Sequence, residues 1–420
     1  MLKSFKIKNF KSILDLTVDF SFAEGKAPNR YKELETLPFL EVGENRVVPT
    51  ISIYGANASG KTNIIKALVA LKDILDENIL KRYDPNKLNA KYNSTSFELN
   101  FCINKANYTY LLEYDYSQIV KESLIKNDNF IFDIKLSKTD FNALSTEFYD
   151  TKKLREIFIV ECGDTNQRQI KPFLSIIAKN YSGLNKYINE VFEYIINNLR
   201  VYPVNQFPVA MGIDLLVNSG DANNTEEAFA KIVKILRKLD IDITKMTYEK
   251  HTIEEYVHSD VDDFTELAKI NDNLIANKIY SYHKDISGND IKFNFNEESE
   301  GTRTLTGLLG VFLSALATGS TVFIDELEQS LHPLLLIEVI KLFKDKRYNK
   351  NNAQLIFTAH NTDILDDDLM RVSEIAIVKK SLEKGTTINR VVDFEGVRNV
   401  LNFRKQYLEG AFSGIPHPYI

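Results

Sequence analysis

The sequence predicts an α/β fold in which helices pack on a mixed β-sheet, because strand and helix patterns alternate in two separate parts of the chain. Val47–Tyr54 is a β-branched run that leads into glycine, and apolar residues then recur at helical spacing over Ile64–Leu75. Further along, Thr321–Ile324 and Gln354–Phe357 have the pattern of buried strands, with an apolar helix over Pro333–Phe343 between them. Alternation of this kind is typical of a parallel sheet with helices on its faces.

Two more groups of strands are predicted in the first lobe. Phe5–Ile7 and Leu16–Phe20 indicate a hairpin, which we place at the edge of this lobe. Apolar residues alternate from Ser96 to Asp115 around a turn near Asn104–Asn107. These strands are expected to be antiparallel and to extend the lobe.

The middle of the chain shows helical patterns instead. Between about residues 120 and 285 the clearest are Leu174–Asn198 and Thr225–Leu239, after which an apolar helix starts at Thr302. We therefore expect three parts: an N-terminal lobe over 1–120, a mainly helical insertion domain over 121–288 and a C-terminal lobe over 289–420.

Composition is that of a soluble globular protein, with 44% hydrophobic and 26% charged residues among 420. The net charge of −6 and the lack of a visible basic stripe argue against a surface coated for nucleic acid, although a local basic groove can exist in an acidic chain. The longest apolar run, Leu305–Ala317, is interrupted and too short for a membrane span, which needs roughly 20 residues. The N-terminus lacks a secretory signal pattern, and Cys102 and Cys162 form no metal-ligand pattern. We expect a cytoplasmic protein without membrane contact.

A phosphate-binding motif follows the first strand. Gly55–Thr62 satisfies the pattern G-x-x-x-x-G-K-[ST] between a strand and a helix, which defines a P-loop. Glycines let the backbone wrap phosphates, while Lys61 reaches the β- and γ-phosphates and the Thr62 hydroxyl holds Mg²⁺. The predicted nucleotide-binding residues are Asn57, Ala58, Ser59, Gly60, Lys61, Thr62 and Asn63. Lys61 also counts as catalytic.

Two acids end the strand Thr321–Ile324, at the edge where open α/β sheets bind ligands. Asp325 suits the Mg²⁺ shell because a hard cation prefers carboxylate oxygen. Glu326 is placed to orient and deprotonate an attacking water. The alternative is a helix N-cap followed by a solvated acid.

With these motifs the chain resembles the ABC-type ATPases of the RecF/SMC-like group, and more narrowly the AbiLi and RloA type of AAA-ATP/GTP phosphatase linked to bacterial phage defence. The wide separation of Lys61 and Asp325 agrees with a large insertion, as in that group. The matching segments are Ile7–Ser12, Gly55–Asn63, Glu298–Thr302, Asp325–Pro333, Gln354–His360, Tyr407–Pro416 and, more loosely, Leu236–Ile243 and His283–Lys284.

The resemblance implies an ABC-type ATPase head that dimerises head to head, with two ATP molecules sandwiched between the P-loop of one subunit and a signature loop of the other. Ser299, Gly301 and Thr302 occupy the place of that signature, although Ser299 also suits an ordinary helix N-cap. His360 corresponds to the switch histidine that contacts the γ-phosphate.

Some positions in the matching segments are less informative. The resemblance places Lys11 and Ser12 near the nucleotide. His332 follows the two acids, at a place where the family has a loop that contacts the other subunit. A structural turn and a subunit contact are equally good interpretations of His332. Ala411 stands where the family usually has arginine, and no Q-loop glutamine can be assigned.

The expected function is that of an ATPase that binds ATP and Mg²⁺ as a homodimer or higher homo-oligomer. In this hypothesis it is the sensor or motor subunit of an anti-phage system with a separate effector, for which a nuclease is one candidate, and with DNA or a phage component as a candidate further partner. ATP is favoured over GTP because no Asn-Lys-x-Asp motif occurs. The alternative is a RecF/SMC-like DNA-repair or chromosome-maintenance clamp. A nuclease within this chain is disfavoured, because the 60 residues after His360 are too few for a nuclease domain and the acids at 366–368 suit a solvated turn.

Overall fold

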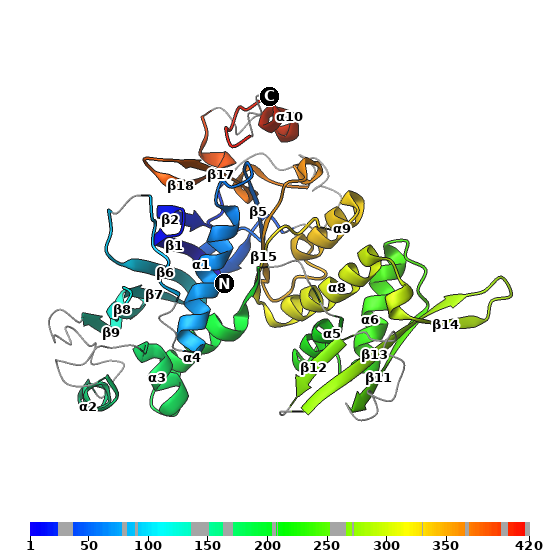
Figure 1. The fold of residues 1–420 in the computed structure, drawn as a ribbon, viewed down its shortest axis with the longest axis horizontal. Coiled ribbons are helices and arrows are strands. Elements are labelled where there is room, and N and C mark those ends of the chain that lie inside the picture. The colour runs from blue at the N-terminus through cyan, green and yellow to red at the C-terminus, as the bar shows by residue number, and fades with distance from the viewer. Residues whose placement is uncertain are drawn as a thin grey trace.

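A computed structural model describes residues 1–23, 37–77, 82–88, 91–135, 151–162, 171–203, 207, 209–252, 266–270, 273–329, 331–365, 369–395 and 402–415. The acidic turn predicted at 366–368 lies outside these residues. The main feature is a 12-stranded sheet with the order β10-β15-β16-β5-β17-β18-β2-β1-β6-β7-β8-β9 (Figure 1). The sheet confirms the α/β class, with one parallel half and one antiparallel half.

The parallel half contains three strands that the sequence predicted and two that it did not. The predicted ones are β15 (Thr321–Ile324), β16 (Gln354–Thr358) and β5 (Thr50–Tyr54), and the others are β10 (Leu199–Tyr202) and β17 (Ile375–Ser381). Each is parallel to its neighbour. Apart from β10 and the outer end of β17, these strands are buried, which explains their continuous apolar runs.

Helices cover both faces of the parallel half. Helix α1 (Lys61–Glu77) shares a core with Phe323 and Ile356, whereas α8 (Glu300–Thr318) and α9 (Pro333–Lys344) share another core with the alternate strand residues Val322, Ile324, Leu355 and Phe357. This alternation is the period-2 pattern of a strand with helices on each side.

The antiparallel half consists of β18 (Gly385–Arg390), β2 (Ile13–Asp19), β1 (Leu2–Phe10), β6 (Thr95–Ile103), β7 (Ala106–Tyr114), β8 (Ile119–Lys126) and β9 (Asn129–Lys135). The predicted N-terminal hairpin exists, with Phe5 opposite Val18. Its predicted place at an edge is wrong, because β1 also pairs with β6 and β2 with β18. Local sequence cannot show such pairings, which join segments far apart in the chain.

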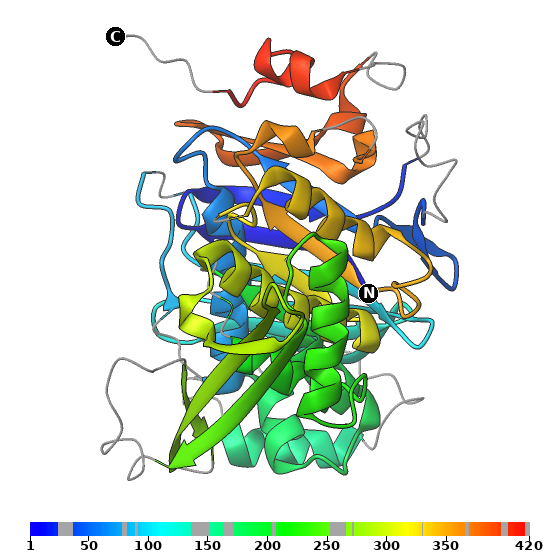
Figure 2. The same ribbon diagram turned by 90° about the vertical axis from the view of Figure 1, so that its right-hand side faces the viewer.

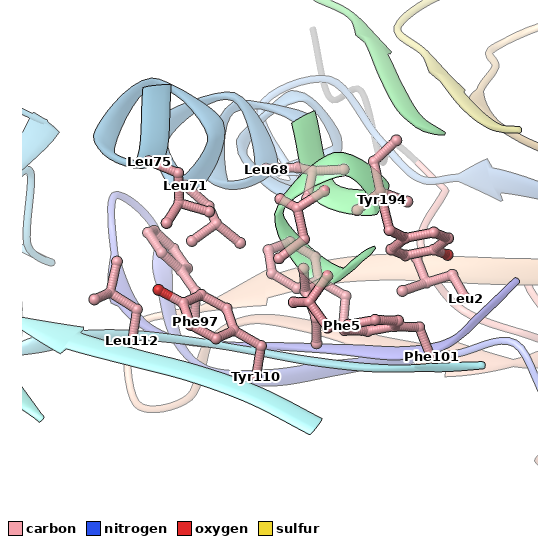
Figure 3. Close-up of a cluster of buried hydrophobic side chains, with 14 of the residues drawn as sticks. Leu2, Phe5, Leu68, Leu71, Leu75, Phe97, Phe101, Tyr110, Leu112 and Tyr194 are labelled. Carbon is pink, nitrogen blue, oxygen red and sulfur yellow. The ribbon is translucent and has the colours of Figure 1, made fainter. Parts of the chain in front are cut away.

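A large apolar core joins this half to α1. Phe5, Phe97 and Tyr110 rise from the strands toward Leu68 and Leu71 of the helix (Figure 3). Beside them, the rings of Phe101 and Tyr194 stack with centroids 4.6 Å apart. Burial of this surface fixes α1, and with it the end of the P-loop at Lys61 and Thr62, against the sheet.

The middle of the chain is helical in α2 (Thr151–Cys162), α3 (Phe173–Asn180), α4 (Lys186–Glu193), the π-helix Tyr194–Asn198, α5 (Val209–Asn218) and α6 (Thr225–Lys238). The helical pattern predicted over 174–198 is interrupted, because Asn185 caps α4. The segment is less helical than expected, because it also supplies most of β8 and all of β9 and β10 to the main sheet. The domain boundaries stay a prediction.

The same segment forms most of a second sheet of four strands, β11 (Lys245–Thr252), β12 (Glu266–Ile270), β13 (Asn273–Lys284) and β14 (Asp290–Asn294). A small hairpin, β3 (Leu40–Val42) and β4 (Asn45–Val47), and the short helix α10 (Phe403–Leu408) complete the named elements. None of the helices described here is long and apolar enough to cross a membrane.

Helices α5 and α8 pack with their backbones in close contact. A Cβ atom added at Gly307 would lie 1.8 Å from the Phe207 carbonyl oxygen, and one at Gly310 would lie 2.6 Å from Gly212. Only glycine permits this approach.

A buried ion pair connects the end of α9 to the start of β17, next to β5. Lys344 at the end of α9 and Glu374 before β17 are almost completely buried and bond each other directly. Glu374 also accepts hydrogen bonds from the Thr50 hydroxyl and the Arg371 amide. A paired charge in an apolar core is stable only with such additional partners.

Glu374→Ala should therefore lower the free energy of unfolding by about 3–5 kcal/mol, because it leaves the Lys344 charge buried without its partner. Urea denaturation measures the change. Glu338→Ala, which removes an exposed partner of Lys341, is the control and should cost at most about 1 kcal/mol. Equal losses in the two variants would contradict the structural role of the buried pair.

Candidate functional site

Three of the predicted motifs, the P-loop, the acids after β15 and His360, meet at one edge of the parallel half. Strands β5, β16 and β15 are adjacent and parallel, so their carboxyl ends lie side by side. These ends carry Gly55, His360 and Asp325 respectively. The edge of an open α/β sheet is where such folds bind ligands.

The P-loop residues 55–60 turn sharply between β5 and α1. A Cβ at Gly55 would lie 2.3 Å from the Val378 carbonyl oxygen, and one at Gly60 would lie 2.2 Å from the Thr386 hydroxyl. Both glycines are thus needed for close packing against β17 and β18. Asn57 and Ala58 are exposed at the outer part of the loop, and Thr62 and Asn63 lie in the first turn of α1.

Lys61 is held inside this loop. Its ammonium donates to the carbonyl oxygens of Gly55 at 2.7 Å and Ala56 at 3.3 Å. Burial lowers the pKa of Lys61 from its ordinary value, and the negative charges of Asp325 and Glu326 oppose that shift. The loop therefore holds a cation close to its own backbone, opposite two carboxylates.

Thr358 connects the two acids at the end of β15. Its buried hydroxyl donates to Asp325 Oδ1 at 2.5 Å and accepts from the Glu326 amide at 2.8 Å. Glu326 has a left-handed backbone with φ 52°, which is unfavourable for a residue other than glycine. The hydroxyl of Thr358 therefore orients the Asp325 carboxylate and helps hold Glu326 in this conformation.

The predicted catalytic side chains Glu326 and His360 lie together. Glu326 Oε1 is 3.8 Å from His360 Nε2, and both side chains are about half exposed. Glu328 supports the histidine loop, because its carboxylate accepts from the amides of His360 and Asn361. The site thus places a carboxylate and an imidazole side by side at the carboxyl ends of β15 and β16.

Ser12 contacts the P-loop helix α1, and its predicted place near the nucleotide stays a prediction. Its hydroxyl accepts a hydrogen bond from the side-chain Nδ2 of Asn63 at 2.7 Å and is also 2.7 Å from the Thr386 hydroxyl. Thr386 in turn donates to the Ser59 carbonyl oxygen at 2.9 Å. Lys11 instead pairs with Asp84, so its charge is already balanced.

The predicted signature loop is placed elsewhere. Ser299 caps α8 by accepting from the Thr302 amide at 3.1 Å, with Gly301 between them. Glu298 anchors the loop to β13 through His283 Nε2 at 2.6 Å. Figure 1 shows this end of α8 beside β13 and β14, on the side of the molecule away from α1. The loop is exposed, and within one subunit the structure does not bring it to the P-loop.

His332 has a structural role in this chain. Its Nδ1 accepts a hydrogen bond from the Leu334 amide at 3.3 Å and caps α9. Of the two roles considered for His332, a structural turn and a subunit contact, this finding supports the structural turn.

The residues present fit a phosphate with Mg²⁺. The P-loop offers the first turn of α1 and a buried cation, and the Ser59 hydroxyl is buried without a hydrogen-bond partner within the described residues. Nowhere in the described part of the chain do three or more His, Cys, Asp or Glu side chains gather into a metal cage. Mg²⁺ suits this arrangement because it commonly binds through one or two carboxylates plus phosphate oxygens. Thr62 and Asp325 would hold it.

Together, the strand-loop-helix geometry and the buried lysine define a P-loop nucleotide-binding domain. The sequence profile of one family, described as "AAA domain, putative AbiEii toxin, Type IV TA system", matches residues 51–366. The chain belongs to this family. The narrower resemblance to the AbiLi and RloA type stays a prediction.

Two solved structures show weaker similarity. One is the SMC head domain from Thermotoga maritima, at 15% identity and a TM-score of 0.42, covering 93% of this chain and 98% of that one. The other is the Smc head domain of Pyrococcus furiosus bound to the C-terminal domain of ScpA, at 14% identity and a TM-score of 0.38, covering 92% and 95%. Similarity this low supports no conclusion. No curated protein matches the sequence.

Sequence reasoning missed several residues that build the site. Thr386 reaches the P-loop from β18, and nothing in its local sequence marks it. Glu328 was visible only as part of a matching segment. Tyr54 is the last residue of β5, and its hydroxyl donates to the Asn361 carbonyl oxygen at 2.9 Å. A signal for Tyr54 was available, since a buried tyrosine at a strand end needs a hydrogen-bond partner.

Thr358→Val should reduce the gain in nucleotide affinity that Mg²⁺ provides by about tenfold, because the Asp325 carboxylate loses a hydrogen bond that orients it. Affinity without Mg²⁺ should change little. Calorimetric titration with and without Mg²⁺ tests this. Thr358→Ser keeps the hydroxyl and should restore the gain; if serine and valine variants behave alike, the hydroxyl does not position Asp325.

Proposed function

We propose that this protein is an ATPase that dimerises around ATP and Mg²⁺ and acts as the sensor or motor subunit of an anti-phage system with a separate effector. The observation that carries the proposal is the meeting of Lys61, Asp325, Glu326 and His360 at adjacent strand ends. The family description, with its toxin and type IV system, supports a role in defence. The absence of a guanine-reading motif favours ATP.

The proposed chemistry follows from the residues. Bound Mg²⁺ would supply positive charge to the phosphates. The Lys61 ammonium would exchange its carbonyl partners for phosphate oxygens, and its positive charge would offset part of the negative charge that the phosphates bring to a site already lined by carboxylates. Glu326 would orient a water and accept its proton, and His360, 3.8 Å from Glu326, would contact the terminal phosphate.

A dimer would complete this site. The Ser299 loop is an exposed N-terminus of the long helix α8 and lies away from the P-loop of its own subunit. Helix N-termini favour anions. In a head-to-head pair, the loop of one subunit would approach the phosphate held by the other, so that occupancy of the site and association are coupled.

Glu326→Gln should retain ATP binding and slow hydrolysis by at least about 100-fold, because only the proton acceptor is removed. The variant should also accumulate as a dimer with ATP, as measured by light scattering.

Lys61→Ala should lose tight ATP binding, because the phosphates lose their cationic contact; calorimetry measures the affinity. Lys66→Ala on the exposed side of α1 and Glu41→Gln on β3 are matched controls with expected wild-type behaviour. Hydrolysis by the Gln variant at the wild-type rate would remove Glu326 from this role.

The defence role needs a separate experiment. The protein is co-expressed with its neighbouring genes, and the mass of the purified complex is determined with and without ATP. A defined complex with a second protein that ATP remodels would support the proposal. A chain that remains alone and dimerises on DNA with ATP would favour the repair or chromosome clamp.

One observation favours that second candidate. Two adjacent hollows of about 650 and 330 Å³ share Lys234 and Lys238 of helix α6. Arg237 and Lys245 line the first and Lys350 lines the second. Within the described residues these five side chains form no ion pair, and all are exposed. The fold thus places Lys350 beside four cations that are close in sequence, with Glu226 and Asp221 also in the lining, and such a cluster of cations suits a phosphate backbone.

Reversing the charge of Lys234 and Lys238 together should weaken binding to a duplex DNA and reduce the slope of log affinity against log salt by roughly 2. Fluorescence anisotropy at several salt concentrations measures both quantities. Reversal of Lys105 and Lys186, which are exposed on the β6–β7 turn and on α4, is the control. Equal effects of the two double variants would indicate general charge attraction and would contradict a dedicated surface.

A further inference from the structure

The C-terminal segment, residues 402–415, returns to the start of the P-loop. Figures 1 and 2 show α10 together with β17 and β18 at one end of the molecule. A Cβ atom built on Gly414 would lie 2.5 Å from Ile377 Cγ2 and 3.9 Å from the Cα atom of Gly55. Gly414 has φ +77°, and Ser413 before it has φ 57°. A left-handed turn therefore places the segment against the first P-loop residue.

Tyr407 carries the second contact. Its ring centroid is 5.7 Å from that of Tyr54, the residue before Gly55, and its hydroxyl donates to the Gly414 carbonyl oxygen at 3.4 Å. Tyr407, Phe403 and Phe412 are buried in the core that contains Tyr54. The segment is thus packed into the body of the domain by one face.

Tyr54 extends this contact to the histidine loop. It is fully buried, and burial raises the pKa of its hydroxyl well above the ordinary value, so the group remains a donor to the Asn361 carbonyl oxygen. Asn361 directly follows His360. Arg404 adds an ion pair with Asp363 of the same loop at 2.9 Å, although the pair is largely exposed and contributes little.

We propose that residues 402–415 are a positioning element of the nucleotide site, in which Tyr407 acts through Tyr54 to hold the first P-loop turn and the His360 loop in one arrangement. The inference rests on the proposed function, because both loops belong to that site. Since binding at one place and docking at another are reciprocally coupled, nucleotide should also tighten the docking of the segment.

Tyr407→Ala should lower kcat/KM for ATP by about tenfold or more, because a small displacement of the two loops misplaces the reacting groups. Tyr407→Phe keeps the ring and should restore most of the activity. Leu408→Ala, on the exposed side of α10, is the matched control. Gly414→Ala is a second test that leaves Tyr407 intact and should also lower kcat/KM, because its Cβ would collide with Ile377.

Amide hydrogen exchange provides a readout that general loss of stability would not imitate. In the wild type, ATP with Mg²⁺ should slow exchange within 402–415, and this protection should be lost in Tyr407→Ala and in Lys61→Ala. A wild type that binds no ATP by calorimetry would overturn the proposed function. A wild type that binds ATP without protection of 402–415, or Tyr407→Ala and Gly414→Ala variants with wild-type kcat/KM, would overturn this inference alone.

Discussion

The parallel pairing of β15, β16 and β5 is the constraint on which the site depends. β5 (Thr50–Tyr54) is far in sequence from β15 (Thr321–Ile324) and β16 (Gln354–Thr358), and each strand is short. Their registers place Ile53 opposite Thr358 and Ile324 opposite Phe357, so the residues after each strand emerge at the same level. A slip of one residue would send every side chain to the other face and would separate the acids from the P-loop.

Helices on both faces stabilise this register. The alternate residues of β15 and β16 enter two different cores, and each core would be disrupted by a shift. The buried Lys344–Glu374 pair adds a polar requirement beneath β5 that only one arrangement satisfies. Precise placement of Asp325, Glu326 and His360 is thus a property of the whole parallel half rather than of the loops that carry these residues.

Sequence alone predicted the parts of the molecule whose signals are local. The P-loop, the acids after β15 and the strand before His360 follow short motifs with a strong periodic context, and their elements were predicted within a few residues. The central position of the β1–β2 hairpin and the strands of the middle segment could not be predicted, because they depend on partners distant in the chain. Thr386 was hidden for the same reason, and Tyr407 was visible only as part of a matching segment with no role assigned, since the place of each in the site comes from a neighbour rather than from its own sequence.

The glycine contacts between α5 and α8 have a mechanical consequence. Helices whose backbones are in contact cannot slide or rotate past one another without steric collision. We therefore expect α5 and α8 to move as one rigid unit. The Ser299 loop lies at the N-terminal end of α8, and Glu298 in that loop contacts His283 of β13. A displacement of the Ser299 loop would therefore be transmitted to α5 through the glycine contacts and to β13 through Glu298.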